Sequence, residues 1–452
     1  TDESIQAVSD LFAAHGSNAW YEKEAADILP EGFRCPHCGG VHFTKELDTL
    51  DGWFDSGSTH FAVLENTVKP EWGQQQWPAD LYLEGADQYR GWFQSSLLTA
   101  VAAKGQGAPY KTVLTHGWVV DGEGKAMHKS LGNAVDPQQV IDQYGADILR
   151  MWVASSDYRV DVRISPEIFK QLSQVYLKIR NTARYILGNL DGFDPNNLVP
   201  PEQMLPLDRW AITRLNQLME RVKQGYEDFE YHIVHHSLHN FCVVELSNFY
   251  LDVIKDRLYC EERDGLKRRS AQTAMYLILD TMVRMLAPIL CYTADEIWQA
   301  MPHHKGAVAD HVMFNQMNEP FTAYALSGEE QAQWNELTAL RDDVNLALEA
   351  ARAAKVIGKP LEADVVLHCT KEQAAKFAPQ AGLLANLFIV SNVEVVEGEG
   401  GKPCENVPGV GCEVKEAGGE KCERCWIHDH TVGQNSGHPT LCARCASVVE
   451  KQ

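Results

Sequence analysis

Four cysteines near the carboxyl end constrain the fold of this chain more than any other feature of its sequence. Cys422 and Cys425 form one Cys-x2-Cys pair, Cys442 and Cys445 form a second, and 16 residues separate the two pairs. Two pairs at this spacing are a signature of tetrahedral zinc coordination. Because four thiolates complete the coordination shell and leave no open position for a substrate, the Zn²⁺ is predicted to be structural.

A further Cys-x2-Cys pair lies near the amino end, at Cys35 and Cys38. A single pair supplies two of the four ligands that zinc requires, so two more donors must come from elsewhere. His37 and His42 lie close by in the sequence, and the missing ligands could also lie outside the chain. An unmetallated hairpin is the alternative, and the sequence leaves a second zinc site open.

Composition fits a protein of several domains. The chain has 452 residues, of which 45% are hydrophobic, enough to build several buried cores. Its longest apolar stretch, residues 275–294, is interrupted by Asp280, Arg284 and Pro288, which predicts a buried helix and no membrane span. No signal peptide is visible, so we expect a cytoplasmic location, where cysteine pairs of this kind indicate metal binding and not disulfides. The net charge of −22 disfavours nucleic-acid binding by the whole surface, although local faces can still be basic.

A basic loop lies between a strand-like segment and a helix start. Residues 112–120 form an apolar strand-like run, and the loop that follows carries Lys125 and Lys129 between glycines. Asp136 is a natural N-cap, and Pro137 suits the first position of the next helix. Cations on a short loop at the carboxyl end of a strand suit a polyphosphate, because they stabilise charge on the leaving group. A solvated basic turn is the alternative.

The segment Ala126-Met127-His128-Lys129-Ser130 resembles the KMSKS signature loop of the class I aminoacyl-tRNA synthetases. Two positions depart from the pattern: Ala126 replaces the first lysine, with Lys125 beside it, and His128 replaces the first serine. The resemblance implies that Lys129 contacts ATP, with Lys125 and His128 as further catalytic candidates. The continuation Ser-Leu-Gly-Asn is similar to the isoleucyl enzymes, whereas the valyl and leucyl enzymes tend to read Ser-Lys-Gly-Asn.

A second cluster of candidate site residues lies where a predicted strand ends, at Glu84. Ligands of doubly wound sheets bind at the carboxyl ends of the strands, where Gly85, Asp87 and Gln88 follow. Glu84 is placed to accept a hydrogen bond from a substrate ammonium group, and the resemblance implies this role at the aminoacyl-adenylate. Gly85 lets the backbone approach a nucleotide, and Asp87 and Gln88 offer polar contacts.

The resemblance further implies that two tryptophans, Trp53 and Trp92, wall an isoleucine pocket. Residues 48–57 resemble the family's strand-to-loop signature that leads back into the catalytic fold. Ordinary core packing is the alternative for both indoles, because aromatic side chains dominate cores as well as pockets.

Helical periodicity dominates from Ser165 onward. Ser165 and Pro166 start a first helix, and a Thr293/Glu296 capping box is expected to start a later one. Further helices are expected at 207–229, 232–259, 268–287, 294–301 and 329–355. This pattern resembles the anticodon-binding bundle of the class Ia synthetases. Its exposed basic edge is a candidate contact for tRNA phosphates, with a solvated face as the alternative, and consists of Lys178, Arg180 and Arg184.

The carboxyl-terminal knuckles carry further candidates for tRNA binding. Arg424 and Arg444 are expected to project beside Trp426, which combines charge with a stacking surface suited to single-stranded RNA. The resemblance implies that this end of the chain helps to hold the anticodon region of the tRNA.

The resemblance covers the chain almost end to end and implies the carboxyl-terminal half of an isoleucyl-tRNA synthetase. The expected fold class is α/β plus all-α. The expected domains are the end of the editing insertion with its Cys-x2-Cys knuckle (1–47), the second half of a Rossmann catalytic domain with the KMSKS-like loop (48–160), a helical anticodon-binding domain (161–325), a small mixed α/β domain with strands at 361–368 and 385–396 (326–400), and a glycine-rich linker leading to the zinc domain (401–452).

The activity that the resemblance implies is the ATP- and Mg²⁺-dependent attachment of isoleucine to tRNA(Ile) through isoleucyl-adenylate. The His-x-Gly-His motif of the class I nucleotide site is absent from the sequence, as is most of the editing domain. We therefore expect a monomeric partial enzyme that alone neither activates nor edits. A non-catalytic tRNA-binding fragment or split paralogue, and a valyl- or leucyl-tRNA synthetase, are the alternatives.

Overall fold

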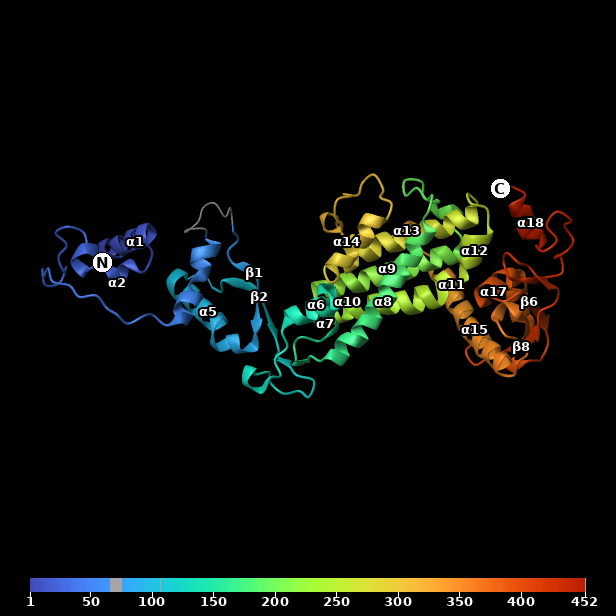
Figure 1. Ribbon diagram of the computed structural model, residues 1–452, viewed down its shortest axis with the longest axis horizontal. Helices are drawn as coiled ribbons and strands as arrows, with labels where there is room; N and C mark the ends of the chain where they lie inside the picture. Colours follow the sequence, from blue (N-terminus) through green and yellow to red (C-terminus); the bar gives the residue numbers. More distant parts are fainter. Residues whose placement is uncertain (66–74, 106, 452) are drawn as a thin grey trace. The chain divides into compact units, whose positions relative to one another are not determined.

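The computed structural model describes residues 1–65, 75–105 and 107–451. Internal contacts divide the chain into two units, Thr1–Gly117 and Trp118–Gln452, shown from blue to red along the sequence in Figure 1. The expected boundaries at 47 and 160 therefore do not coincide with the division by contacts. The catalytic segment predicted over 48–160 contributes to both units.

The first unit contains a small helical part and a β-α-β part. Thr1 caps the first helix, α1, through its side chain. The parallel strands β1 and β2 are joined through helix α5, which is the connection expected of a Rossmann half. The helices and strands of this unit are α1 (Asp2–His15), α2 (Ala19–Glu22), α3 (Ala25–Ile28), α4 (Gly52–Gly57), the π-helical turn η1 (His60–Leu64), β1 (Ala79–Gly85), the 3-10 turn η3 (Ala86–Arg90), α5 (Trp92–Lys104) and β2 (Tyr110–His116).

The second unit begins with the basic loop and the elements that frame it. Strand β3 (Val119–Val120) pairs in parallel with β4 (Val162–Arg163). The 3-10 turn η4 (Lys129–Leu131) lies between them and is followed by α6 (Pro137–Tyr144) and α7 (Ala146–Ser155). As predicted, the Asp136 side chain accepts from the backbone N–H of Gln138 at 2.9 Å, and Pro137 occupies the first turn of α6.

The helical bundle is built on three long helices, α8, α9 and α13, which lie side by side in Figure 1. Ser165 caps α8, whose inward positions recur at helical spacing, as expected. Helix α13 is almost wholly buried. In the part of the chain that the structure describes, no helix is long and apolar enough to cross a membrane. The bundle comprises α8 (Pro166–Asn189), α9 (Pro206–Glu227), α10 (Tyr231–Asn240), the π-helix η6 (Phe241–Tyr250), α11 (Leu251–Val253), α12 (Lys255–Cys260), α13 (Leu266–Leu286) and α14 (Cys291–Ala300).

The single helix predicted over 232–259 is wrong, because the structure divides it into four segments from α10 to α12. The second of these segments, η6, is a π-helix, in which hydrogen bonds join residues five positions apart. Phe241 and Leu246, which are five positions apart in this π-helix, are both buried. The chain then turns at Ile254 before α12.

The predicted Thr293/Glu296 capping box is also wrong. The backbone N–H and the hydroxyl of Thr293 both donate to the Asp147 carboxylate, at 2.7 and 2.6 Å. Asp147 belongs to α7, so a buried carboxylate from another helix satisfies the start of α14. Local sequence could not reveal a cap donated from so far along the chain.

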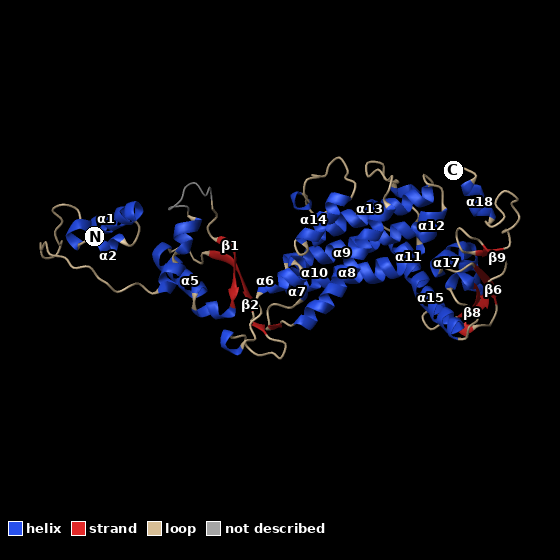
Figure 2. Cartoon of the chain, viewed as in Figure 1, coloured by secondary structure: helices blue, strands red, loops and turns tan. Residues whose placement is uncertain are grey.

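The region after the bundle is a mixed domain followed by the zinc-binding segment (Figure 2). Helix α15 (Gly328–Ala353) begins with a Ser327/Glu330 capping box and buries Leu337, Leu340 and Leu348. The four-stranded sheet has the order β6-β5-β8-β7. Its elements are β5 (Ala363–Cys369), α16 (Lys371–Phe377), α17 (Ala381–Phe388), β6 (Asn392–Glu397), β7 (Lys402–Pro403) and β8 (Val410–Glu416); β9 (Glu420–Lys421), β10 (His428–Asp429) and α18 (Ala443–Val449) form the zinc-binding segment.

Two expectations for this region are wrong. The strand predicted over 385–396 begins only at Asn392, because Leu384, Leu387 and Phe388 bury one face of α17 instead. The glycine-rich linker contains β8, which pairs antiparallel with β5 over the full length of both strands. Since β8 lies inside the sheet, the domain boundary expected at 400 moves beyond residue 416.

Candidate functional site

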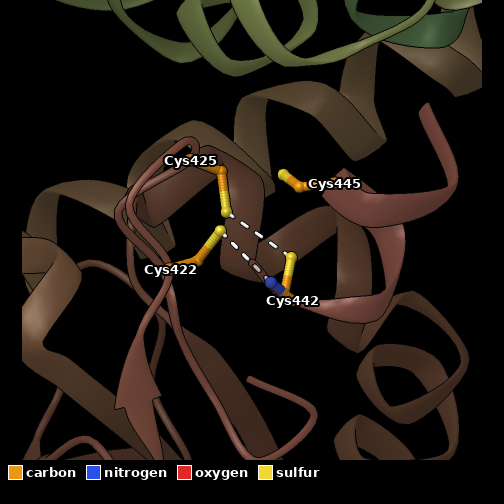
Figure 3. Close-up of side chains that lie close together, drawn as sticks. All are labelled: Cys422, Cys425, Cys442 and Cys445. Carbon is orange, nitrogen blue, oxygen red and sulfur yellow. Dashed lines mark hydrogen bonds between the residues drawn. The ribbon is translucent and has the colours of Figure 1, made fainter. Parts of the chain in front are cut away.

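The four carboxyl-terminal cysteines converge as the spacing predicts (Figure 3). Their Sγ atoms all lie within 4.8 Å of one another, and all four residues are buried. The Sγ atoms of Cys425 and Cys442 are 3.8 Å apart, and the Cys442 backbone N–H donates to the Cys422 sulfur at 3.4 Å. Among the described residues these four thiols form the whole donor group, which fits tetrahedral zinc, so this cluster is a structural zinc site.

The electrostatics of the four thiols differ from one another. Burial acts to raise the pKa of Cys422, but the backbone N–H groups of Cys425, Cys442 and Arg424 outweigh it and lower that pKa to about 7. Burial raises the pKa of Cys445 to about 12, with a further contribution from Cys442. Zinc requires all four as thiolates, so binding must release protons.

The expectation that Arg444 projects from its knuckle is wrong, because its guanidinium holds the zinc segment against the bundle. It forms two hydrogen bonds to the Asp256 carboxylate of α12, at 2.5 and 2.7 Å. Beside it, Arg424 donates from Nη1 to the Cys260 carbonyl at 3.0 Å. Both arginines therefore dock one domain on another, and neither is available in full for a partner.

Trp426, in contrast, is an exposed stacking surface. Its side chain is 57% exposed, and Lys421 Nζ lies 5.5 Å from its ring centroid. It borders a cavity of about 410 Å³, lined also by Lys255 and Tyr259 of α12. The combination of cation and aromatic ring expected here comes from Lys421 rather than from Arg444.

In the first unit, the predicted site residues gather at the carboxyl ends of two parallel strands. Glu84 and Gly85 at the end of β1 pair with Thr115 and His116 at the end of β2. Glu84 is exposed and Gly85 is buried, and a Cβ on Gly85 would come within 2.6 Å of Asp87 Oδ1. A side chain at position 85 would displace the exposed Asp87 carboxylate from its present place. His116, which the sequence patterns did not assign to this site, joins the cluster through strand register.

The two tryptophans of this unit have different environments. The Trp92 indole stacks on Tyr82 with ring centroids 4.1 Å apart and donates to the Ser56 carbonyl at 2.9 Å, so it serves core packing at least in part. Trp53 is 48% exposed and lies against Gly91, where a Cβ would come within 2.8 Å of the indole. Gly91 is therefore a further residue that shapes this site. Its only sequence signal is a glycine immediately before a helix.

Gln88 has a structural role beside these aromatic residues. Its Oε1 accepts from the backbone N–H of Trp92 at 2.8 Å, which satisfies a donor at the start of α5. Its amide nitrogen donates to Asp87 at 3.2 Å. The polar cluster at the end of β1 is thus ordered by its own hydrogen bonds.

The basic loop is held in shape by one asparagine. Asn133 donates to the Asp121 carboxylate at 2.8 Å and to the Ala126 carbonyl at 3.2 Å, and it accepts from the His128 backbone N–H at 2.9 Å. Asp121 also accepts from the Lys125 backbone N–H at 2.9 Å. The Asn133 amide, followed by this N–H, lowers the pKa of Asp121. The fourth residue of the Ser-Leu-Gly-Asn continuation thus organises the whole loop.

The two lysines of the loop are not equivalent. Lys125 forms an exposed ion pair with Glu123, with Nζ and Oε2 2.7 Å apart. Lys129 opens the 3-10 turn η4, and its side chain lies outside the described residues. His128 contributes its backbone N–H to the loop structure. The candidate nucleotide residues therefore divide between the two units, with Glu84 in the first and Lys129 in the second.

Replacement of Asn133 by alanine is expected to loosen this loop. The change removes three hydrogen bonds, each of net value about 1 kcal/mol. Hydrogen exchange of a peptide covering residues 121–134 should accelerate on the order of tenfold or more. Gln138→Ala is the matched control, because its side-chain amide bonds to Asp142 within α6 and not to the loop in the described part of the chain. Equal exchange in Asn133→Ala and wild type would contradict the role of Asn133.

The basic edge of α8 lies on the solvent side, as predicted. Lys178, Arg180 and Arg184 are all exposed. Arg180 lies 3.4 Å from Glu296 of α14, an exposed pair that solvent screens strongly. The edge is therefore available to a partner.

The Cys35/Cys38 knuckle forms a turn in which Gly39 N–H donates to the Cys35 carbonyl at 2.8 Å. Backbone N–H groups of Cys38 and His37 lower the pKa of Cys35. Within 1–65, 75–105 and 107–451, the carboxyl-terminal cysteines are the one group of three or more side chains arranged to hold a metal. A second zinc site stays a prediction.

Three known protein families match successive parts of the chain. Residues 1–165 match the family described as tRNA synthetases class I (I, L, M and V), and residues 208–367 match the anticodon-binding domain of tRNA ligase. Residues 419–448 match the zinc finger found in FPG and IleRS. Fold, loop and zinc centre together define part of a class I aminoacyl-tRNA synthetase.

Curated relatives narrow the class. Proteins named isoleucine–tRNA ligase match at 52% identity in Syntrophotalea carbinolica, 48% in Caldanaerobacter subterraneus and 49% in Geobacter sulfurreducens, over 98%, 100% and 99% of this chain. The chain belongs to the isoleucine–tRNA ligase family. It spans about half the length of these relatives, 47% to 48%.

A solved structure supports the fold. The ternary complex of Agrobacterium radiobacter K84 LeuRS with tRNA and LeuAMS matches with a TM-score of 0.52 and 18% identity. The match covers 65% of this chain and 36% of that one. At this identity the likeness concerns the fold alone.

Proposed function

We propose that this chain is the carboxyl-terminal part of an enzyme that attaches isoleucine to tRNA(Ile) at the expense of ATP. The observation that carries the proposal is the match to isoleucine–tRNA ligases at 48% to 52% sequence identity over 98% to 100% of the chain. The Ser-Leu-Gly-Asn continuation of the basic loop favours isoleucyl over valyl or leucyl specificity.

The proposed reaction has two steps. The isoleucine carboxylate attacks the α-phosphate of ATP, which forms isoleucyl-adenylate and releases pyrophosphate. A ribose hydroxyl of the tRNA then attacks the acyl carbon and releases AMP. Catalysis of such a phosphoryl transfer rests on positioning and charge stabilisation, with Mg²⁺ neutralising phosphate charge.

Each cluster of residues has a role in this scheme. Glu84 binds the ammonium group of isoleucine, while Gly85, Asp87 and Gln88 hold the adenylate at the end of β1. Trp53 forms part of the wall of the amino-acid pocket. Its exposed indole, which packs on Gly91, supports this role. Lys129 stabilises the departing pyrophosphate.

The tRNA lies on the second unit in this proposal. The exposed edge of Lys178, Arg180 and Arg184 contacts its phosphates. Trp426, with Lys421 beside it, stacks on an unpaired base of the anticodon region. Arg424 and Arg444 support this surface by docking the zinc segment.

The test joins this chain to the remaining half of the Syntrophotalea carbinolica relative. In the joined protein, Lys129→Ala should lower isoleucine-dependent pyrophosphate exchange about 10²- to 10³-fold, the usual cost of removing one transition-state contact. Binding of tRNA(Ile) should change less than about twofold, because Lys129 acts on the leaving group. Lys125→Ala is the comparison, and its effect should be smaller because the resemblance assigns the ATP contact to Lys129.

Three outcomes would overturn parts of the proposal. Equal loss of exchange and tRNA binding in Lys129→Ala would mean that the loop is misplaced. Exchange that responds to valine or leucine in preference to isoleucine would change the substrate. Tight tRNA binding without any exchange in the joined protein would favour a non-catalytic tRNA-binding module.

A further inference from the structure

The last residue of β4, Arg163, lies beside the basic loop. It pairs in parallel with Val120, the last residue of β3, and the turn of residues 121–124 follows directly after Val120. Because the carboxyl ends of parallel strands lie at one edge of a sheet, Arg163 and the loop emerge at the same edge, where ligands of such folds bind. The sequence patterns did not single out Arg163.

The guanidinium group of Arg163 lies over Gly124. A Cβ atom on Gly124 would be 3.4 Å from Nη2, 3.7 Å from Nε and 3.8 Å from Cζ of the arginine, which are contact distances. Gly124 has a φ of 87°, a conformation that glycine adopts without a steric cost. The turn therefore holds this cation next to the first residues of the signature loop, Lys125 and Ala126.

Arg163 also lies in one row with the position where the signature loop departs from its pattern. Ala126 stands where the pattern has its first lysine. It forms an antiparallel bridge with Val120, and Val120 pairs with Arg163 in the other strand. The backbones of Ala126 and Arg163 are thus two strand spacings apart, roughly 10 Å. The long arginine side chain crosses much of this gap, because its guanidinium group reaches Gly124.

The positive charge of Arg163 is available to a ligand. Its side chain is exposed, and none of the described residues forms a hydrogen bond or an ion pair with its guanidinium group. Lys125, in contrast, lies 2.7 Å from a carboxylate oxygen of Glu123. A guanidinium group is always charged and presents a planar fork of donors that matches the oxygens of a phosphate. An exposed arginine at this edge therefore suits a polyphosphate.

We propose that Arg163 contacts the polyphosphate of ATP and supplies the charge of the signature lysine that Ala126 replaces. The inference rests on the proposed function and adds a catalytic residue to its first step. In that step a carboxylate oxygen of isoleucine bonds to the α-phosphorus, and the bond from this phosphorus to the bridging oxygen breaks. The electron pair leaves with pyrophosphate, and Arg163 stabilises the charge that develops on the departing oxygens.

The test uses the protein joined to the remaining half of the Syntrophotalea carbinolica relative. Arg163→Ala should lower isoleucine-dependent pyrophosphate exchange about 10²-fold, the usual cost of removing one transition-state contact. Binding of tRNA(Ile) should change less than about twofold. Adding Ala126→Lys to Arg163→Ala should restore most of the lost rate, because a cation returns to the signature position. Arg159→Ala is the matched control, since Arg159 precedes the same strand but pairs with Asp157 and Glu230.

The outcomes separate this inference from the proposed function. Unchanged pyrophosphate exchange in Arg163→Ala, with an active joined wild type, would overturn the role of Arg163 and leave the synthetase proposal intact. A loss that Ala126→Lys does not repair would mean that Arg163 only supports the turn, and would also overturn it. Faster hydrogen exchange of residues 121–134 in Arg163→Ala without ATP would identify that case. A joined wild type without any pyrophosphate exchange would instead count against the proposed function.

Discussion

Cys445→Ser is expected to release the zinc ion and unfold the carboxyl-terminal segment. Cys445 is fully buried, and the small core of this segment consists of the four ligand cysteines, Cys260 of the bundle and a few partly buried side chains around them. A segment with so little apolar core depends on its metal, which contributes apparent folding energies of about 10–16 kcal/mol in isolated zinc fingers. Three remaining thiolates cannot replace the lost ligand, because no other donor joins the cluster within the described part of the chain.

Elemental analysis and hydrogen exchange measure this result. The variant should lose about one equivalent of zinc, and residues 419–451 should exchange at rates near those of an unfolded chain. Cys291→Ser is the control, because Cys291 lies in the bundle near Asp147 and not in the cluster. A variant that keeps its zinc and its protection from exchange would show that the segment is held by other contacts.

Features of the fold that depend on short-range patterns could be predicted from the sequence. Two residues separate the cysteines within each pair, a spacing that lets both thiolates reach one tetrahedral metal ion. The cap at Ser165 and the apolar stripe of α8 follow from helical periodicity in one continuous segment. The strand end at Glu84 is marked by the change from apolar to polar residues within a few positions.

Contacts between distant side chains could not be predicted in this way. Asp147 caps α14, and Asp256 receives Arg444, yet nothing near either carboxylate in sequence indicates its partner. Asp343 of α15 likewise accepts the backbone N–H groups of Asn406 and Val407, so a buried charge organises a loop that reads as a linker. Such pairings depend on how the helices pack, because burial of a charge requires a partner that packing alone supplies.

In the candidate site too, some features follow from the local sequence and others depend on tertiary structure. Glu84 and Gly85 could be placed at a strand end from the sequence, but the arrival of His116 beside them required the parallel register of β1 and β2. The basic loop could be recognised from its residue pattern, whereas the role of Asn133 as its organiser depends on three hydrogen bonds across a turn. A pattern therefore identified the chemical groups, and tertiary structure determined their geometry.

Asp208→Ala is expected to destabilise the bundle by about 3–5 kcal/mol, the usual cost of leaving one member of a buried ion pair without its partner. Asp208 is fully buried and accepts from both terminal nitrogens of Arg257, at 2.9 and 3.0 Å. The Tyr250 hydroxyl donates to it at 2.8 Å, and Ser270 donates as well. Burial, followed by the Asp208 charge, raises the pKa of Tyr250 well above its usual value, so this hydroxyl stays a donor.

Urea unfolding followed by circular dichroism measures the difference through a lower midpoint of the bundle transition. Asp252→Ala is the control, because its pair with Lys255 is exposed on both sides and should contribute at most about 1 kcal/mol. Asp208→Asn should fall between the two, since the amide keeps the volume and accepts one hydrogen bond but leaves the Arg257 charge unpaired. A loss below 1 kcal/mol in Asp208→Ala would mean that water or another group reaches Arg257.

The same substitution should also weaken the docking of the zinc segment. Arg257 and Asp256 are neighbours on α12, so the helix that Asp208 anchors also presents the carboxylate that receives Arg444. If the anchor fixes Asp256, Arg444→Met should cost less protection from hydrogen exchange in the zinc segment when Asp208 is already alanine than when it is intact. A double-mutant cycle with a coupling energy near zero would show that α12 stays in place without its buried charge.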